Sequence, residues 1–230
     1  MRSGRLRGLS FFCALVLLVP FFCFQGAAES PVYRSVPNEE KRIALTFDDG
    51  PHPVQTRRIL EILARYGVRA TFFMIGENVR YYPDTAREVL AAGHEVGNHT
   101  YSHLHLKNLT EWTLGEEVGA CEDVLEELCE YRPHLFRPPE GALTPFVRHC
   151  SERSDYALVL WSLDTRDWEG RSAGEIVDCV LSSIRPGDIV LMHDYIGRHS
   201  ETPEALELLL PALLAEGYEP VTVSRLLGFG

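Results

Sequence analysis

Two adjacent carboxylates and a spaced pair of histidines are the side chains of this sequence best suited to metal chemistry. Asp48 and Asp49 follow an apolar run and precede Gly50. Two like charges this close resist joint ionisation unless a cation or a metal lies between them. His99 and His103 are four residues apart, which puts both imidazoles on one face of a helical turn and suits two ligands of one metal. Together they indicate a site with two histidines and one carboxylate as ligands, and open positions for water and substrate.

Other side chains with useful chemistry lie in three later segments, and each segment directly follows a short apolar run. The segments are residues 136–141, 161–168 and 191–194. Singly, each has a structural explanation: a salt-bridged arginine, an aspartate that caps a helix, a core tryptophan, or a His–Asp pair on the surface. The first two motifs also have one, since Asp-Gly turns and solvated histidine pairs are common. Found in one chain and always at strand ends, the five segments together favour a catalytic site.

The elements that must position these groups alternate regularly along the chain. Buried strands are predicted at seven short apolar runs: Ile43–Phe47, Ala70–Phe73, Glu95–Val96, Leu135–Phe136, Ala157–Trp161, Ile189–Met192 and Pro220–Val223. Helices are predicted at five segments with helical periodicity: Thr56–Tyr66, Pro83–Ala92, Thr110–Glu130, Ala173–Ile184 and Pro203–Glu216. This alternation predicts an α/β fold with parallel pairing and right-handed crossovers. The number of strands fits a small (β/α) barrel better than an open doubly wound sheet, which is the alternative. In both folds the functional groups gather where the strands end.

The composition describes one sizeable domain with an acidic surface. The chain has 230 residues, of which 45% are hydrophobic and 24% charged, and its formal net charge is −11. The apolar content excludes a disordered chain. The negative charge argues against nucleic acid as a partner. No feature of the sequence indicates an obligate protein partner.

The first 28 residues have the pattern of a secretory signal peptide. Arginines at positions 2, 5 and 7 precede an apolar run from Leu9 to Phe24, and small residues suited to cleavage follow at 26–28. The run is shorter than the ~20 residues that a membrane-spanning helix needs, and an uncleaved anchor is the alternative. Residues 29–40 are interpreted as a linker, and 41–230 as the domain that carries all five segments. We therefore expect a secreted or cell-envelope protein whose substrate lies outside the cytoplasmic membrane.

An exported chain can form disulfides, and four cysteines lie after the signal segment: Cys121, Cys129, Cys150 and Cys179. If residues 111–130 form one helix, Cys121 and Cys129 are separated by roughly 12 Å of rise, beyond the ~7 Å limit for bridged Cα atoms. Cys129 and Cys150 each close a predicted helical segment, so a 129–150 disulfide is one hypothesis. Four unpaired thiols, packed as small apolar side chains, are the other.

In order and spacing, the five motifs resemble those of the polysaccharide deacetylase family, carbohydrate esterase family 4. They are Thr46–Pro53, His99–His103, Arg137–Gly141, Asp164–Trp168 and Leu191–Asp194, and the similarity extends from about Lys41 to Leu227. The resemblance implies a distorted (β/α) barrel of about seven parallel strands in a single domain. It also implies metal-dependent hydrolysis of N-acetyl, sometimes O-acetyl, groups on extracellular glycans.

The resemblance implies catalytic roles for four matching residues. Asp48 corresponds to the catalytic base and His193 to the catalytic acid. Arg137 corresponds to the residue that pairs with the base, and Asp167 to the one that hydrogen-bonds the acid. An acid and a base whose surroundings push their pKa values apart suit the hydrolysis of an amide.

The resemblance also implies binding roles. The ligands of a divalent metal, for which zinc is expected, correspond to Asp49, His99 and His103. Trp168 and Leu191 correspond to the walls of the pocket that receives the acetyl methyl group. Glu140 stands where many family members have tyrosine, and this added carboxylate is expected to affect which sugar fits.

These roles describe a hydrolase that removes N-acetyl groups from an extracellular acetylated glycan. Peptidoglycan amino sugars are the first candidate substrate and chitin-type oligomers the second. The alternatives are a glycan-binding protein without turnover and a metallohydrolase of small amides. The separate base and acid argue against a pure binder, which has no use for them.

Overall fold

The computed structural model describes residues 31–105, 109–196 and 200–229. The segment predicted as signal peptide or anchor, residues 1–28, lies outside these ranges. Among the helices of the described ranges, none combines the length and the apolar character needed to cross a bilayer.

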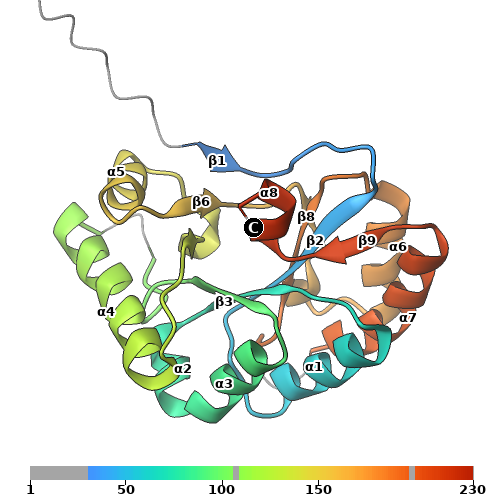
Figure 1. Cartoon of the computed structure of the whole chain (residues 1–230), viewed down its shortest axis with the longest axis horizontal. Helices are drawn as coiled ribbons and strands as arrows, with labels where there is room; N and C mark the ends of the chain where they lie inside the picture. The colour runs from blue at the N-terminus through green and yellow to red at the C-terminus, as the bar shows by residue number, and fades with distance from the viewer. Residues whose placement is uncertain (1–30, 106–108, 197–199, 230) are drawn as a thin grey trace, which may run out of the picture.

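A curled sheet forms the centre of the molecule (Figure 1). Its strands are β1 (Val32–Tyr33), β2 (Arg42–Asp48), β3 (Thr71–Met74), β4 (Glu95–Asn98), β5 (Leu135–Phe136), β6 (Ala157–Val159), β7 (Leu163–Asp164), β8 (Ile189–His193) and β9 (Glu219–Val221). The strand order is β1-β6-β5-β4-β3-β2-β8-β7, and β9 also pairs with β2. All pairings between these strands are parallel, as the alternation of strands and helices predicts.

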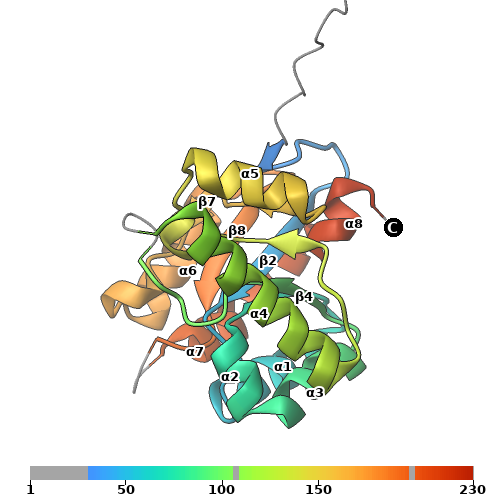
Figure 2. The same ribbon diagram turned by 90° about the vertical axis from the view of Figure 1, so that its left-hand side faces the viewer.

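Helices surround the sheet (Figures 1 and 2). They are α1 (Gln55–Tyr66), α2 (Gly76–Tyr81), α3 (Pro83–Ala91), α4 (Glu111–Cys129), α5 (Pro145–Arg153), α6 (Ala173–Ser183), α7 (Thr202–Ala215) and α8 (Val223–Leu227). Local sequence sets their ends: Ser172 and Glu175 form a capping box at the start of α6. All five predicted helices are present. The short helices α2, α5 and α8, of six, nine and five residues, were not predicted.

The prediction of a distorted barrel is confirmed, with the refinement that the sheet curls without closing. β1 and β7 are the two ends of the strand order, and within the described chain no pairing joins them. Each of these strands has only two residues, and neither was predicted. The stretch interpreted as a linker supplies β1, in which Val32 and Tyr33 pair with Leu158 and Val159.

Alternation along the central strand β2 separates the two faces of the sheet. Leu45 and Phe47 pack in the main core with residues of the surrounding helices, whereas Ala44 belongs to a second, inner cluster. Successive side chains of a strand point to opposite faces, so Thr46 and Asp48 share the inner face with Ala44. At the carboxyl end of β2, the side chains of Thr46 and Asp48 therefore point into the barrel.

The four described cysteines are all free, so the predicted 129–150 disulfide is wrong. Cys150 packs with Leu114 and Val118, near the start of α4. Cys129 is the last residue of that helix, which is roughly 28 Å long. The alternative holds instead: the thiols pack with apolar side chains, and burial raises the pKa of Cys121 to about 12.

Tight packing on the inner face generates a prediction at Gly97 of β4. A Cβ atom there would lie 2.4 Å from the ring of Phe73, which is fully buried. We expect Gly97→Ala to lower the free energy of unfolding by about 1–3 kcal/mol, the usual cost of overpacking. Urea unfolding measures the loss.

Gly119→Ala on α4 is the matched control, because nothing lies within 4 Å of a Cβ at that position. This variant should match the parent or gain up to ~1 kcal/mol, since alanine favours a helix. Equal destabilisation by both substitutions would contradict the packing argument.

Candidate functional site

Strand register places the predicted base and the predicted acid side by side. Asp48 ends β2, His193 ends β8, and the two residues are partners in this parallel pair. Thr46 and Leu191 are partners two residues earlier, so all four side chains share the inner face. The ends of the two strands therefore open into the same space.

Arg137 forms a buried ion pair with Asp48. Its Nη1 lies 2.6 Å from Oδ1 of Asp48 and donates to Oγ1 of Thr46 at 2.8 Å. Nη2 donates to the carbonyl of Leu160 at 3.0 Å and Nε to that of Val159 at 3.4 Å. The arginine is fully buried, and a buried charge is tolerated only with this many partners.

Two aromatic rings hold the guanidinium from the sides. The Cζ atom of Arg137 lies 4.0 Å from the ring centre of Phe73 and 5.7 Å from that of Trp161, distances typical of cation–π contacts. Oδ1 of Asp48 is thus paired with the arginine. The other, Oδ2, lies 3.7 Å from Nε2 of His99 and faces the candidate metal ligands.

Asp49, His99 and His103 converge on one point and fit a metal ion. Oδ1 of Asp49 lies 3.4 Å from Nε2 of each histidine. This oxygen is buried and has no hydrogen-bond partner among the described residues, an arrangement that is costly without a cation. Ligand atoms about 2.0–2.1 Å from a tetrahedral zinc lie about 3.4 Å from one another.

Neighbouring groups position two of these three residues. Nδ1 of His99 lies 2.6 Å from the carbonyl oxygen of Arg137, so Nδ1–H donates and Nε2 keeps its lone pair toward Asp49. Asn78 donates from Nδ2 to the carbonyl of Asp49 at 2.8 Å. Each contact fixes a ligand from outside the metal site.

The spacing of the two histidines works differently from the prediction. Residues 99–105 form a loop rather than a helical turn, and Thr100 and His103 have positive φ angles of 68° and 53°. Such backbone is uncommon for residues other than glycine and persists where the surrounding structure fixes it. The imidazoles meet because the loop bends, not because of helical periodicity.

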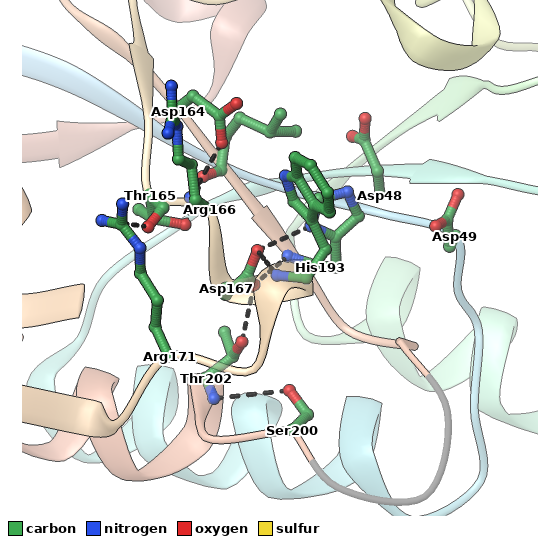
Figure 3. A network of polar contacts seen from close by, with 12 residues as sticks. Asp48, Asp49, Asp164, Thr165, Arg166, Asp167, Arg171, His193, Ser200 and Thr202 are labelled. Carbon is green, nitrogen blue, oxygen red and sulfur yellow. Dashed lines mark hydrogen bonds and ion pairs between the residues drawn. The ribbon is translucent and has the colours of Figure 1, made fainter. Parts of the chain in front are cut away.

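His193 is held by Asp167, which lies in the loop after β7 (Figure 3). Nδ1 of His193 lies 2.7 Å from Oδ1 of Asp167, and the backbone N–H of His193 donates to Oδ2 at 2.7 Å. Thr202, the first residue of α7, donates from its hydroxyl to Oδ2 at 2.7 Å. The backbone N–H of Trp168 donates to Oδ1 at 3.0 Å. The buried carboxylate is therefore fully hydrogen-bonded and faces the ring from a fixed position.

These contacts raise the pKa of His193 and lower that of Asp49. Burial alone lowers the pKa of His193, but the hydrogen bond and charge of Asp167, with the charges of Asp48 and Asp49, raise it to about 9. Burial alone raises the pKa of Asp49, yet its contact with His99 and the charges of His99, His193 and His103 bring it below the usual value. At neutral pH, His193 is charged and Asp49 is ionised.

A cavity of about 490 Å³ joins these groups. Its lining comes from the ends of several strands and comprises Asp48, Asp49, His99, His103, Glu140, Trp161, Asp164, Trp168, Leu191 and His193. Of the predicted site residues, Arg137 and Asp167 alone are not in this lining, because they lie behind the base and the acid. Trp168 is half exposed and Leu191 is buried, so they form an outer and an inner wall.

Several residues that shape the site were not predicted. Trp161 and Asp164 line the cavity, and both stood in a segment that the sequence had singled out. Thr202 had no signal, because its only link to the motifs is the contact with Asp167.

Asp194 is a further difference, because the His–Asp pair was given a surface position as its structural explanation. The side chain is fully buried and accepts a hydrogen bond from Oγ1 of Thr56 at 2.5 Å. It packs against Gly50, where a Cβ would lie 2.1 Å from its carboxylate. Burial raises the pKa of Asp194 to about 7. It supports, from behind, the turn that carries Asp48 and Asp49.

Known proteins are similar to this one in sequence and in fold. Residues 35–159 match the family model described as polysaccharide deacetylase. A peptidoglycan-N-acetylglucosamine deacetylase of Bacillus cereus is 42% identical over 196 residues, covering 84% of this chain and 92% of that protein. A chitooligosaccharide deacetylase of Bradyrhizobium sp. is 38% identical over 191 residues, covering 78% and 87%. The crystal structure of the Bc1960 peptidoglycan N-acetylglucosamine deacetylase, in complex with a benzamide compound, gives a TM-score of 0.83 at 35% identity, covering 86% and 92%.

The curled parallel (β/α) barrel, with Asp48 and His193 beside a candidate metal site, has the arrangement of a metal-dependent hydrolase. The chain belongs to the polysaccharide deacetylase family, and the resemblance drawn from the five motifs is confirmed. The family is metal-dependent, in agreement with the cluster of Asp49, His99 and His103.

The contact between Asp167 and His193 predicts a change in pH dependence. Asp167→Asn removes the anion that raises the pKa of His193, so the imidazolium should lose its proton at a lower pH. Because the acid must be protonated to work, the alkaline limb of the pH–rate profile should move to lower pH. Rates of acetate release between pH 5 and 10 measure this shift, and an unmoved alkaline limb would contradict the assignment.

Proposed function

We propose that this protein is a zinc-dependent N-deacetylase of an extracellular glycan, with peptidoglycan amino sugars as the first candidate substrate and chitin-type oligomers as the second. One observation carries the proposal: two separate networks fix a base and an acid on the same cavity. Arg137 holds Asp48, and Asp167 holds His193. The cluster of Asp49, His99 and His103 lies beside both.

The base and the acid have distinct tasks in amide hydrolysis. A zinc ion held by Asp49, His99 and His103 would polarise the acetyl carbonyl and favour ionisation of a water molecule. Oδ2 of Asp48 accepts the proton of the attacking water, since Oδ1 is occupied by Arg137. His193, charged at neutral pH, donates the proton that the leaving amine needs.

The cavity supports an acetylated sugar as the group that enters. Leu191 offers an apolar wall for the acetyl methyl group, and the half-exposed Trp168 offers a face on which a sugar ring can pack. The relatives named above act on peptidoglycan N-acetylglucosamine and on chitooligosaccharides, which supports the same substrate class.

An extracellular location is part of the proposal. It is supported by the signal-like pattern of the first 28 residues and by the cell-wall substrate in the name of a relative. A glycan-binding role without turnover explains neither the buried Arg137–Asp48 pair nor the contact between Asp167 and His193.

Acetate release tests the proposed activity directly. The protein is assayed on an N-acetylglucosamine oligomer, on peptidoglycan and on a small N-acetyl amide, before and after chelation and after zinc is restored. We expect release from the glycans that stops on chelation and returns with zinc. Full activity after exhaustive chelation would refute metal dependence, and release from the small amide alone would refute a glycan substrate.

Four substitutions separate chemistry from metal binding. Asp48→Asn and His193→Ala should lower turnover by ~10²–10⁴-fold, the usual worth of one positioned acid or base. Both should leave the metal content near that of the parent, because neither residue belongs to the ligand cluster. Asp49→Asn and His99→Ala should lose metal together with activity.

Metal content by elemental analysis and turnover at saturating zinc are measured on all four variants. Equal loss of metal in every variant would remove the distinction between ligands and catalysts. Near-native turnover of His193→Ala would remove the assignment of the general acid.

A further inference from the structure

The catalytic cavity carries more acidic side chains than the chemistry uses. Its described lining contains the carboxylates of Asp48, Asp49, Glu140 and Asp164, and no lysine or arginine. The first two belong to the base and the metal site. Glu140 and Asp164 remain, and neither contacts the base, the acid or a candidate ligand in any hydrogen bond or ion pair described above.

The backbone turn that carries Glu140 packs closely at this cavity. It lies in the 3-10 turn Pro139–Gly141 with a positive φ angle of 56°. The next residue, Gly141, also has a positive φ, and a Cβ there would lie 2.6 Å from the ring of Trp161. The turn is thus pressed against the same tryptophan that flanks Arg137. Nδ1 of His105, a largely exposed side chain, contacts Oε1 of Glu140 at 2.7 Å.

The position of the scissile amide bond in the sugar determines which substituent comes near Glu140. In a 2-acetamido sugar the amide is on C2, and the neighbouring carbon C3 carries either a hydroxyl or an ether substituent. When the amide reaches Asp48 and His193, the group on C3 must lie at the wall or mouth of the same cavity. Muramic acid carries a lactyl ether there, whose carboxylate is anionic at neutral pH.

We infer that Glu140 makes this site selective for N-acetylglucosamine over N-acetylmuramic acid, by repelling an anionic group on C3 of the sugar. The inference rests on the proposed function, and it names which of the two peptidoglycan sugars is the substrate. A neutral hydroxyl on C3 meets Glu140 without charge repulsion and can donate a hydrogen bond to it. A lactyl carboxylate would place a second like charge near a half-exposed one, and specificity of this kind arises from repulsion of the wrong partner.

One oligosaccharide provides the test. The substrate is a peptide-free peptidoglycan oligomer in which N-acetylglucosamine and N-acetylmuramic acid alternate, so both sugars are present at equal concentration. Mass spectrometry locates each lost acetyl group and gives the ratio of the two rates. The proteins are the parent, Glu140→Gln, Glu140→Lys and the matched control Glu130→Gln. Glu130 is exposed and also has a positive φ, of 52°, but it lies at the end of α4.

We expect the parent to deacetylate N-acetylglucosamine at least ~10-fold faster than N-acetylmuramic acid, a discrimination that one charge contact can supply. Glu140→Gln should lower the ratio of the N-acetylglucosamine rate to the N-acetylmuramic acid rate several-fold, chiefly through faster reaction of the muramic sugar. Glu140→Lys should lower this ratio further. Glu130→Gln should keep the parental ratio. Because screening weakens charge repulsion, added salt should narrow the parental ratio and leave that of Glu140→Gln nearly constant.

A parent that prefers N-acetylmuramic acid, or a ratio unchanged in Glu140→Gln and Glu140→Lys, would overturn the inference while leaving the deacetylase activity established. Failure of the parent to release acetate from either sugar would instead overturn the proposed function, and the inference with it. Metal content of each variant, expected to equal that of the parent, shows that a changed ratio does not come from a damaged site.

Discussion

A guanidinium group buried inside the barrel is the constraint on which the rest of the site depends. Arg137 has no exposed surface, and its charge is balanced by Asp48 and by three further oxygens from β2, β6 and the residue after β6. Removing one partner of such a pair usually costs 3–5 kcal/mol, about a third or more of the stability of an ordinary domain. The strands that meet around Arg137 are therefore held in one arrangement, in which Oδ1 of Asp48 pairs with the guanidinium and Oδ2 faces the candidate metal ligands.

The site applies the same physical device twice, with opposite charges. A buried cation pairs with Asp48, the candidate base, and a buried anion raises the pKa of His193, the candidate acid. Asp167 is satisfied by Thr202 and by two backbone N–H groups as well as by the ring of His193, so its charge stays in place. Each partner approaches from behind the group it controls, and the cavity between base and acid stays open to substrate.

Strained backbone collects in the loops that complete the site. Asp49, Thr100, His103 and Glu140 all have positive φ angles although none is glycine. Such conformations cost of order 1–3 kcal/mol each and persist where the surrounding structure over-determines them. Here the parallel strands supply that support. The loops with positive φ angles bring Asp49 and His103 together and place Glu140 at the cavity.

The sequence by itself determined the α/β class, the main strands and helices, and ten residues that the structure gathers at one site. Apolar runs mark buried strands, and motifs at the ends of parallel strands meet on one face. The individual residues and their roles came from the resemblance of the five motifs to those of a known family. Tertiary structure alone decided the open edge between β1 and β7, the loop geometry that joins the histidines, and the support from Thr202 and Asp194. It also decided that Cys129 and Cys150 stay apart, at opposite ends of α4. These features depend on contacts between residues that are far apart in the chain. Local periodicity reports only on neighbouring residues, so it cannot predict such contacts.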